Sequence, residues 1–185
     1  MIEPTRHIDS AQAAVRTPAI PVGRRVYAIG DIHGRVDLFD AMIEAIEEDD
    51  AAAQLAISTV ILLGDLVDRG PESAAVVARA RAWGKQREVR IIAGNHEEMF
   101  LQSFHDMDVL RYFLRYGGRE TLLSYGIEAG RPLTERDLRS VQAAMEAQVP
   151  AEDRHFIAGF EDVIEIGSYI FVHAGIRPDL PLDKQ

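Results

Sequence analysis

The feature that most restricts the fold of this chain is a short apolar run ending in glycine, which occurs three times before residue 95. The runs are RVYAIGD at 25–31, STVILLGD at 58–65 and EVRIIAG at 88–94. Between them, residues 36–50 carry apolar side chains at helical spacing, and residues 71–83 lie between a first-turn proline and a capping glycine. Apolar strands that alternate with helices predict an α/β fold, with a parallel sheet covered on both faces.

The rest of the chain predicts further helices and then a hairpin. Residues 97–150 are helical in pattern, and Thr134 is a plausible N-cap. Residues 162–175 predict two strands around a Gly-Ser turn. We expect residues 1–24 to be a flexible leader and residues 25–185 to form one domain.

Composition limits the partners. The formal net charge is −10, so nucleic acid and anionic membrane are not expected as partners, because their negative fields repel an acidic chain. An anionic substrate would need local positive charge, which bound metal ions can supply. The chain has no cysteine, which excludes disulfides and thiolate zinc sites and fits a cytoplasmic protein.

Polar residues follow each predicted strand. The motifs are GDIHG at 30–34, GDLVDRG at 64–70, GNHEE at 94–98 and HAG at 173–175. In open α/β folds the carboxyl ends of the strands meet at one edge of the sheet, where ligands bind. Carboxylate, imidazole and amide groups without sulfur suit Mn²⁺, Fe²⁺ or Zn²⁺. The candidate metal ligands are Asp31, His33, Asp65, Asn95 and His173.

Three further residues suit phosphoryl chemistry. Asp68 is placed to orient His96 as an acid–base pair, and the forked guanidinium of Arg69 suits a phosphate oxygen. Two metal ions about 3.5–4 Å apart would lower the pKa of a shared water and clamp an in-line displacement at phosphorus. Two other histidines, His105 and His155, lie in helical regions with no partner motif, so we expect structural roles for them. Glu97 and Glu98 are expected to be acids in the first turn of a helix.

The four motifs in this order resemble the phosphoprotein-phosphatase (PPP) family of binuclear, calcineurin-like metallophosphoesterases. Within that family they are most similar to the bacterial and phage serine/threonine protein phosphatases. The resemblance runs from about Arg25 to Asp179. It implies a central β-sandwich flanked by helices, with two divalent metal ions as cofactors, manganese first and iron or zinc as alternatives.

The resemblance also implies residue roles. Asp31, His33 and Asp65 would hold the first metal, and Asp65, Asn95 and His173 would hold the second. It further implies direct in-line attack on phosphorus by a metal-bridging hydroxide, without a phosphoenzyme.

The same family pattern assigns the remaining roles. His96, paired with Asp68, would protonate the leaving oxygen, while Arg69 and Asn95 would hold the phosphoryl group. These roles make His96, Asp68 and Arg69 the candidate catalytic residues.

The chain departs from the family pattern at one point. The family has one more metal-binding histidine on a strand well after the HAG motif, and this sequence has no histidine after His173. We therefore expect the second sheet and the second metal site to be incomplete. A C-terminally truncated product and a natural short variant both remain open.

The first expectation for function is a metal-dependent phosphomonoesterase that acts on phosphoserine or phosphothreonine proteins, or on a small phosphoester. The identities of His33 and Glu97 are taken to favour this interpretation. One alternative is a symmetrical diadenosine-tetraphosphate hydrolase. Another is a non-catalytic phosphate-binding module, because of the missing histidine.

Overall fold

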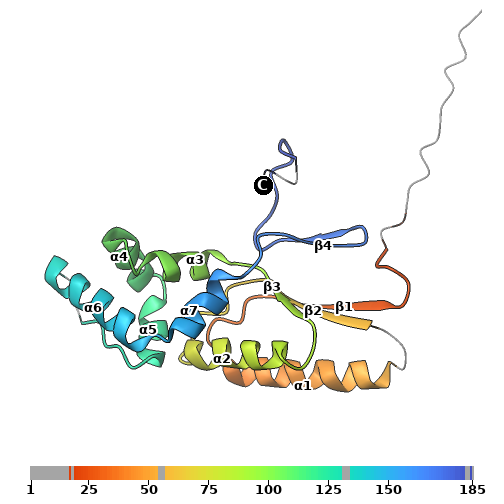
Figure 1. Cartoon of the computed structure of the whole chain (residues 1–185), viewed down its shortest axis with the longest axis horizontal. Helices are drawn as coiled ribbons and strands as arrows, with labels where there is room; N and C mark the ends of the chain where they lie inside the picture. The colour runs from red at the N-terminus through yellow and green to blue at the C-terminus, as the bar shows by residue number, and fades with distance from the viewer. Residues whose placement is uncertain (1–16, 18, 54–56, 131–133, 182–183, 185) are drawn as a thin grey trace, which may run out of the picture.

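A computed structural model describes residues 17, 19–53, 57–130, 134–181 and 184, and its centre is a three-stranded parallel sheet (Figure 1). The strands lie in the order β1-β2-β3 and are joined by two helices, as the sequence predicts. Their bounds are β1 Arg24–Ile29, α1 Val36–Ala52, β2 Ile57–Leu62, α2 Ser73–Gly84 and β3 Val89–Ile91.

Helices α1 and α2 cover one face of this sheet (Figure 1). Side chains alternate between the two faces along a strand, so Val60 and Leu62 of β2 point to the same side. Both are fully buried there, against Phe39 of α1 and Trp83 of α2. The two rings meet edge to face with centroids 5.9 Å apart, which fixes the two helices against each other.

The opposite face of the sheet is covered by a hairpin. Strands β4 (Ile164–Ile166) and β5 (Tyr169–Phe171) pair antiparallel around the predicted Gly-Ser turn. Ile61, which lies between Val60 and Leu62 and points the other way, packs against Ile164 on this side. The sheet therefore lies between a helical layer and a second β layer (Figure 1), the α/β architecture expected from the sequence. Within the described residues this second layer consists of two strands.

The segment just before β1 is held against the same hairpin. The backbone N–H of Ala19 donates to Oγ of Ser168 at 2.6 Å, and Ile20 packs against the apolar side chains of the hairpin. The sequence predicts a flexible leader up to residue 24, and within it Ala19 and Ile20 contact the hairpin. Residues 1–16 and 18 of the predicted leader lie outside the described residues.

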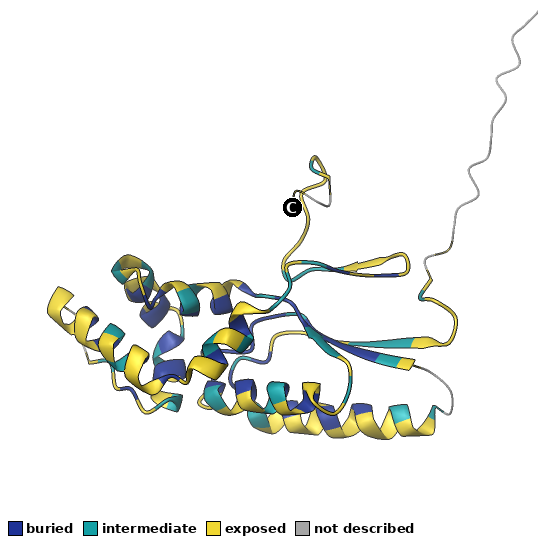
Figure 2. Cartoon of the chain, viewed as in Figure 1, coloured by how far each residue is buried: buried dark blue, intermediate teal, exposed yellow. Residues whose placement is uncertain are grey.

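The predicted helical stretch is confirmed. Its helices pack together around a core of their own and form what is here called the helical lobe (Figures 1 and 2). The buried rings of Phe100 and Phe113 lie at its centre, 5.7 Å apart. Its helices are α3 Asn95–Gln102, α4 Met107–Arg115, α5 Gly118–Ser124, α6 Glu135–Gln148 and α7 Ala151–Ala158.

Two of these helices begin with a side-chain cap. Thr134 caps α6 as predicted and forms a capping box with Asp137, while Asp106 caps α4 by accepting from two backbone N–H groups. Helix α7 lies beyond residue 150, where the predicted helical stretch ends, and it contains His155, which was expected in a helical region. No helix in the described ranges is both long enough and apolar enough to cross a membrane.

Candidate metal centre

The motifs after β1, β2, β3 and β5 converge at one edge of the sheet. The Nε2 atom of His33 lies 3.7 Å from Asp31 Oδ2 and 3.6 Å from Asp65 Oδ2. On the other side of Asp65, Oδ1 lies 3.5 Å from Nε2 of His173. The convergence expected for the ends of parallel strands is therefore present.

Asp65 lies at the middle of this arrangement and is only 4% exposed. It belongs to two groups whose potential ligand atoms all lie within 4.8 Å of one another. One group joins Asp65 with His33 and His96, and the other joins it with Asp31 and His173. Asp65 is the residue that the two groups share, although the groups divide the other residues differently from the two predicted metal sites.

His33 supplies a test of whether a cation fits. Its Nδ1 lies 2.8 Å from the carbonyl oxygen of Val67, which must accept, so Nδ1 carries the proton and Nε2 is left with a lone pair. That Nε2 is buried and has no hydrogen-bond partner among the described residues. It faces the acceptor oxygens of Asp31 and Asp65. Three acceptors that face one another without a donor fit a bound cation.

His173 repeats this pattern. Its Nδ1 lies 2.7 Å from the carbonyl oxygen of Leu63, which fixes the tautomer in the same way. Its Nε2 faces Asp65 Oδ1 at 3.5 Å and Asn95 Oδ1 at 3.3 Å. The nitrogen and oxygen donors predicted for the second metal thus lie together.

His96 and Asp68 form the predicted pair. Nδ1 of His96 donates to Oδ2 of Asp68 at 2.6 Å, and both side chains are buried. The hydrogen bond to this carboxylate raises the pKa of His96 above its ordinary value. The other ring nitrogen, Nε2, is 3.1 Å from Nη2 of Arg69, whose side chain is exposed. His96 thus presents one nitrogen to the open side of the site, beside a permanent positive charge.

The backbone is strained at this site. Four non-glycine residues of the described chain have positive φ angles between 44° and 73°, and all four are predicted site residues. The four are His33, Asp65, Asp68 and Arg69. Each such conformation costs about 1–3 kcal/mol and persists only where surrounding contacts impose it. The loops are therefore held in shape by contacts outside the motifs' own backbone.

Glu97 supplies several of those contacts and is a residue that sequence reasoning missed. It is 1% exposed, and its carboxylate accepts from four backbone N–H groups. The four donors are Asp65 at 2.9 Å, Leu66 at 2.8 Å, Val67 at 3.2 Å and Gly94 at 2.9 Å. The sequence predicts only a first-turn helix acid here. A buried carboxylate that binds the loop after β2 instead fixes the position of Asp65.

Glycine is required where the strand ends approach. A Cβ atom at Gly94 would lie 2.2 Å from Oδ1 of Asp65 and 2.6 Å from its backbone nitrogen. A Cβ at Gly64 would lie 2.8 Å from Nδ1 of His173. Because these two glycines have no Cβ atom, the motifs after β2 and β3 can approach each other closely.

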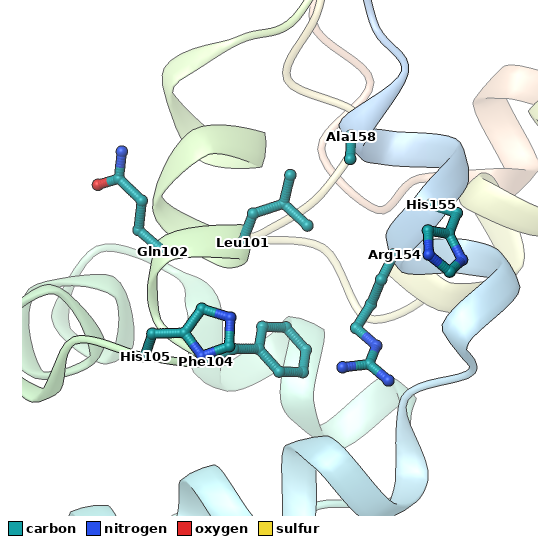
Figure 3. Close-up of a pocket in the computed structure, with 7 residues that line it drawn as sticks. All are labelled: Leu101, Gln102, Phe104, His105, Arg154, His155 and Ala158. Carbon is teal, nitrogen blue, oxygen red and sulfur yellow. The ribbon is translucent and has the colours of Figure 1, made fainter.

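Two pockets lie near these elements. One of about 330 Å³ is lined by Asn95 and His173 of the candidate site, together with the carboxylates of Glu98 and Asp162. A second, of about 450 Å³, is lined by Leu101, Gln102, Phe104, His105, Arg154, His155 and Ala158 (Figure 3). Figure 3 shows residues of α3 and the turn after it facing residues of α7. No predicted site residue lines this second pocket.

The family is identified by comparison with known proteins. The family model described as calcineurin-like phosphoesterase matches residues 24–181. The chain belongs to the calcineurin-like phosphoesterase family. This is a metal-dependent family, so the metallophosphoesterase class expected from the motifs is confirmed.

Several curated relatives of this phosphoesterase are tetraphosphatases. The symmetrical bis(5'-nucleosyl)-tetraphosphatase of Acidovorax ebreus is 30% identical over 171 residues, which are 84% of this chain and 58% of that protein. The one from Nitrosococcus oceani is 36% identical over 106 residues, 54% of this chain and 36% of that protein. The asymmetrical bis(5'-nucleosyl)-tetraphosphatase of Bacillus velezensis is 27% identical over 159 residues, which are 82% of this chain and 56% of that protein. The chain spans less than two thirds of each relative.

Solved structures support the fold. One, provisionally named a diadenosine tetraphosphatase, matches with a TM-score of 0.57 at 21% identity, covering 90% of this chain and 57% of that chain. The cold-active protein-tyrosine phosphatase of a psychrophilic Shewanella species matches with a TM-score of 0.52 at 20% identity, covering 86% and 46%. At these identities the likeness concerns the fold alone.

Proposed function

We propose that this phosphoesterase hydrolyses dinucleoside tetraphosphates symmetrically at the centre formed by its four motifs. The observation that carries the chemistry is the buried carboxylate of Asp65, which faces the Nε2 atoms of His33 and His173. The names of the Acidovorax and Nitrosococcus relatives support the substrate class.

The residues that would hold divalent ions are Asp31, His33, Asp65, Asn95 and His173. Manganese, iron and zinc are all compatible with this donor set. Bound there, the ions would supply Lewis-acid activation of water and would neutralise charge on the phosphate oxygens. The proton positions on His33 and His173 support this assignment, because each ring directs a lone pair toward Asp65.

The remaining site residues bind the substrate and move the proton. The exposed guanidinium of Arg69 would bind a phosphoryl oxygen as a charge-assisted pair, and the amide of Asn95 would donate to another. In the structure Nε2 of His96 accepts a hydrogen bond from Nη2 of Arg69 at 3.1 Å. When Arg69 binds the phosphate instead, Nε2 would take up a proton and give it to the leaving oxygen, with Asp68 stabilising the charged ring. Water would add at one of the two central phosphorus atoms and the bridging P–O bond would break, so that one water and one diadenosine tetraphosphate yield two ADP.

The relatives alter the order of the two enzymatic functions expected from sequence. The Acidovorax and Nitrosococcus relatives are named as symmetrical tetraphosphatases, which corresponds to the alternative and not to the protein phosphatase expected first, while the Bacillus relative is named as an asymmetrical one. In the structure, the two positions used to prefer a protein phosphatase contact other residues of the protein. His33 faces the carboxylates of the centre, and Glu97 is buried against the backbone of the loop after β2.

The charge of the chain is compatible with this substrate class. A tetraphosphate carries several negative charges and approaches a protein of net charge −10. Arg69 and two divalent ions would place positive charge where the phosphates bind, so binding is expected to weaken as salt screens these charges.

The test compares two substrates on the Mn²⁺-loaded chain. We expect kcat/KM for diadenosine tetraphosphate to exceed that for a phosphoserine peptide by at least about tenfold, with ADP as the only nucleotide product. A His96→Ala variant should lose about 10²-fold or more in kcat for phenyl phosphate, whose phenolate leaving group needs a proton. Preference for the phosphopeptide would restore the protein phosphatase, and binding without turnover would indicate a non-catalytic phosphate-binding module.

A further inference from the structure

The catalytic pair is held from the helical lobe by a residue that no motif contains. Thr121, on α5, is fully buried, and its Oγ1 donates to Oδ1 of Asp68 at 2.6 Å. The same Oγ1 accepts from the backbone N–H of Asp68 at 2.8 Å. One hydroxyl therefore contacts both the side chain and the main chain of the residue that orients His96.

Both oxygens of the Asp68 carboxylate accept a hydrogen bond. Oδ2 accepts from Nδ1 of His96, and Oδ1 accepts from Thr121. A carboxylate bound at both oxygens cannot rotate about its own axis without breaking a charge-assisted hydrogen bond. The orientation of Asp68 fixes that of the His96 ring, and so fixes where Nε2 points.

The segment that begins α5 also supports the strained backbone. Asp68 and Arg69 have φ angles of 73° and 67°, a conformation unfavourable for residues with a side chain. The backbone N–H of Arg69 donates to the carbonyl oxygen of Gly117 at 3.0 Å, one residue before α5 begins. The end of the loop after β2 is thus bound to α5 at two consecutive residues.

We propose that Thr121 is a positioning residue, whose hydroxyl fixes Asp68 and thereby orients His96 for proton delivery to the leaving group. This rests on the proposed function, because it takes His96 to be the general acid. Through this hydroxyl the helical lobe would contribute to proton transfer by His96. The simpler interpretation is that Thr121 only satisfies buried polar groups, and the two interpretations differ in their effect on leaving groups.

The variants are Thr121→Val, which keeps the shape and removes the hydroxyl, and Thr121→Ser, which keeps the hydroxyl. Ser73→Ala is the matched control, because the buried Oγ of Ser73 has hydrogen bonds to the backbone N–H of Asp68 and to Oγ1 of Thr121, both at 3.0 Å, but none to the carboxylate of Asp68. Thr121→Ala is a second variant without the hydroxyl. Each variant is first required to show a cooperative urea unfolding transition.

The kinetic measurement uses two aryl phosphates on the Mn²⁺-loaded full chain. Phenolate is a poor leaving group that needs a proton, whereas 4-nitrophenolate leaves without one. Thr121→Val should lower kcat for phenyl phosphate by about tenfold or more, and that for 4-nitrophenyl phosphate by less than about threefold. Thr121→Ser should recover most of the loss, and Ser73→Ala should leave the ratio of the two rates unchanged. Equal losses on both substrates, or no recovery with serine, would overturn the proposal.

A spectroscopic measurement separates this proposal from the proposed function. The short hydrogen bond between His96 and Asp68 should give a low-field proton resonance, recorded with and without Zn²⁺ and assigned by its absence in His96→Ala. The signal should shift or disappear in Thr121→Val and persist in Thr121→Ser, even if the chain hydrolyses no phosphate ester. An unchanged signal in Thr121→Val would contradict the positioning role. Failure of both Thr121→Val and Thr121→Ala to fold would make Thr121 a structural residue and would also overturn the proposal.

Discussion

The carboxylate of Glu97 accepts a hydrogen bond at 2.9 Å from the backbone N–H of Asp65, although the two residues follow different strands. Through this bond and two similar ones from Leu66 and Val67, the first turn of α3 fixes the loop after β2. The position of the central carboxylate therefore depends on a buried residue that is not itself a candidate metal ligand.

Replacing this buried carboxylate should destabilise the protein. In Glu97→Gln one oxygen becomes an NH₂ group that faces backbone donors, so we expect a loss of about 2–4 kcal/mol in the free energy of unfolding. Urea denaturation followed by circular dichroism measures it. Glu98→Gln, at the next and exposed position, is the control and should change stability by less than about 0.5 kcal/mol. Similar losses in the two variants would contradict the role given to Glu97.

The motif glycines should differ in their tolerance of alanine. Gly94→Ala places a methyl group 2.2 Å from Oδ1 of Asp65, so it should abolish metal-dependent hydrolysis and lower the unfolding midpoint. Gly30→Ala introduces a methyl group with no atom outside the neighbouring residues within 4 Å, and its φ is not positive, so it should remain active. Activity of the two variants toward 4-nitrophenyl phosphate tests this contrast. It would be refuted by an inactive, folded Gly30→Ala protein.

The pH dependence of hydrolysis should depend on Asp68. Its carboxylate raises the pKa of His96, so the ring keeps the proton that a general acid needs to a higher pH than an unpaired histidine would. Asp68→Asn removes the charge and should move the alkaline limb of kcat/KM to lower pH, with kcat reduced by about 10²-fold. A pH–rate profile of both proteins, each loaded with Mn²⁺, measures the shift. An alkaline limb at the same pH in both would exclude His96 as the group that titrates.

Metal removal should lower the thermal stability of the wild type. An ion that binds only the folded state at 100 times its dissociation constant adds about 2.7 kcal/mol to stability. We therefore expect Mn²⁺ to raise the melting temperature of the chelator-treated chain, and His33→Ala to lose most of that increase. His105→Ala, outside the candidate site, is the matched histidine control and should respond as the wild type does. An equal increase in wild type and His33→Ala would argue against the assignment of His33.

The fold and the convergence of the motifs could be predicted because their signals are local. Each strand is an apolar run, each ends in glycine, and parallel strands bring their carboxyl ends to one edge. The bounds of helix α7 were not predicted although its start carries a signal, since Pro150 stands at its N-cap and two acids lie in its first turn.

The supports of the site could not be predicted from local pattern. Thr121 is 53 residues from Asp68 in the chain, and their contact depends on how α5 packs against α2 and α4. The positive φ angles of Asp65 and Asp68 are equally invisible, because tertiary contacts impose them against the residues' own preference. Glu97 had an ordinary explanation as a helix acid, and only burial revealed its four backbone partners.

The measurement that tests the central claim most directly is Mn²⁺-dependent hydrolysis of diadenosine tetraphosphate by the wild type and by Asp65→Asn. Asp65 belongs to both groups of candidate ligands, so its loss affects every ion that the site would hold. The expected result is ADP formation by the wild type on addition of Mn²⁺, with a rate of hydrolysis at least about 10²-fold lower in the folded variant. Undiminished hydrolysis by Asp65→Asn, or none by a folded and Mn²⁺-loaded wild type, would contradict it.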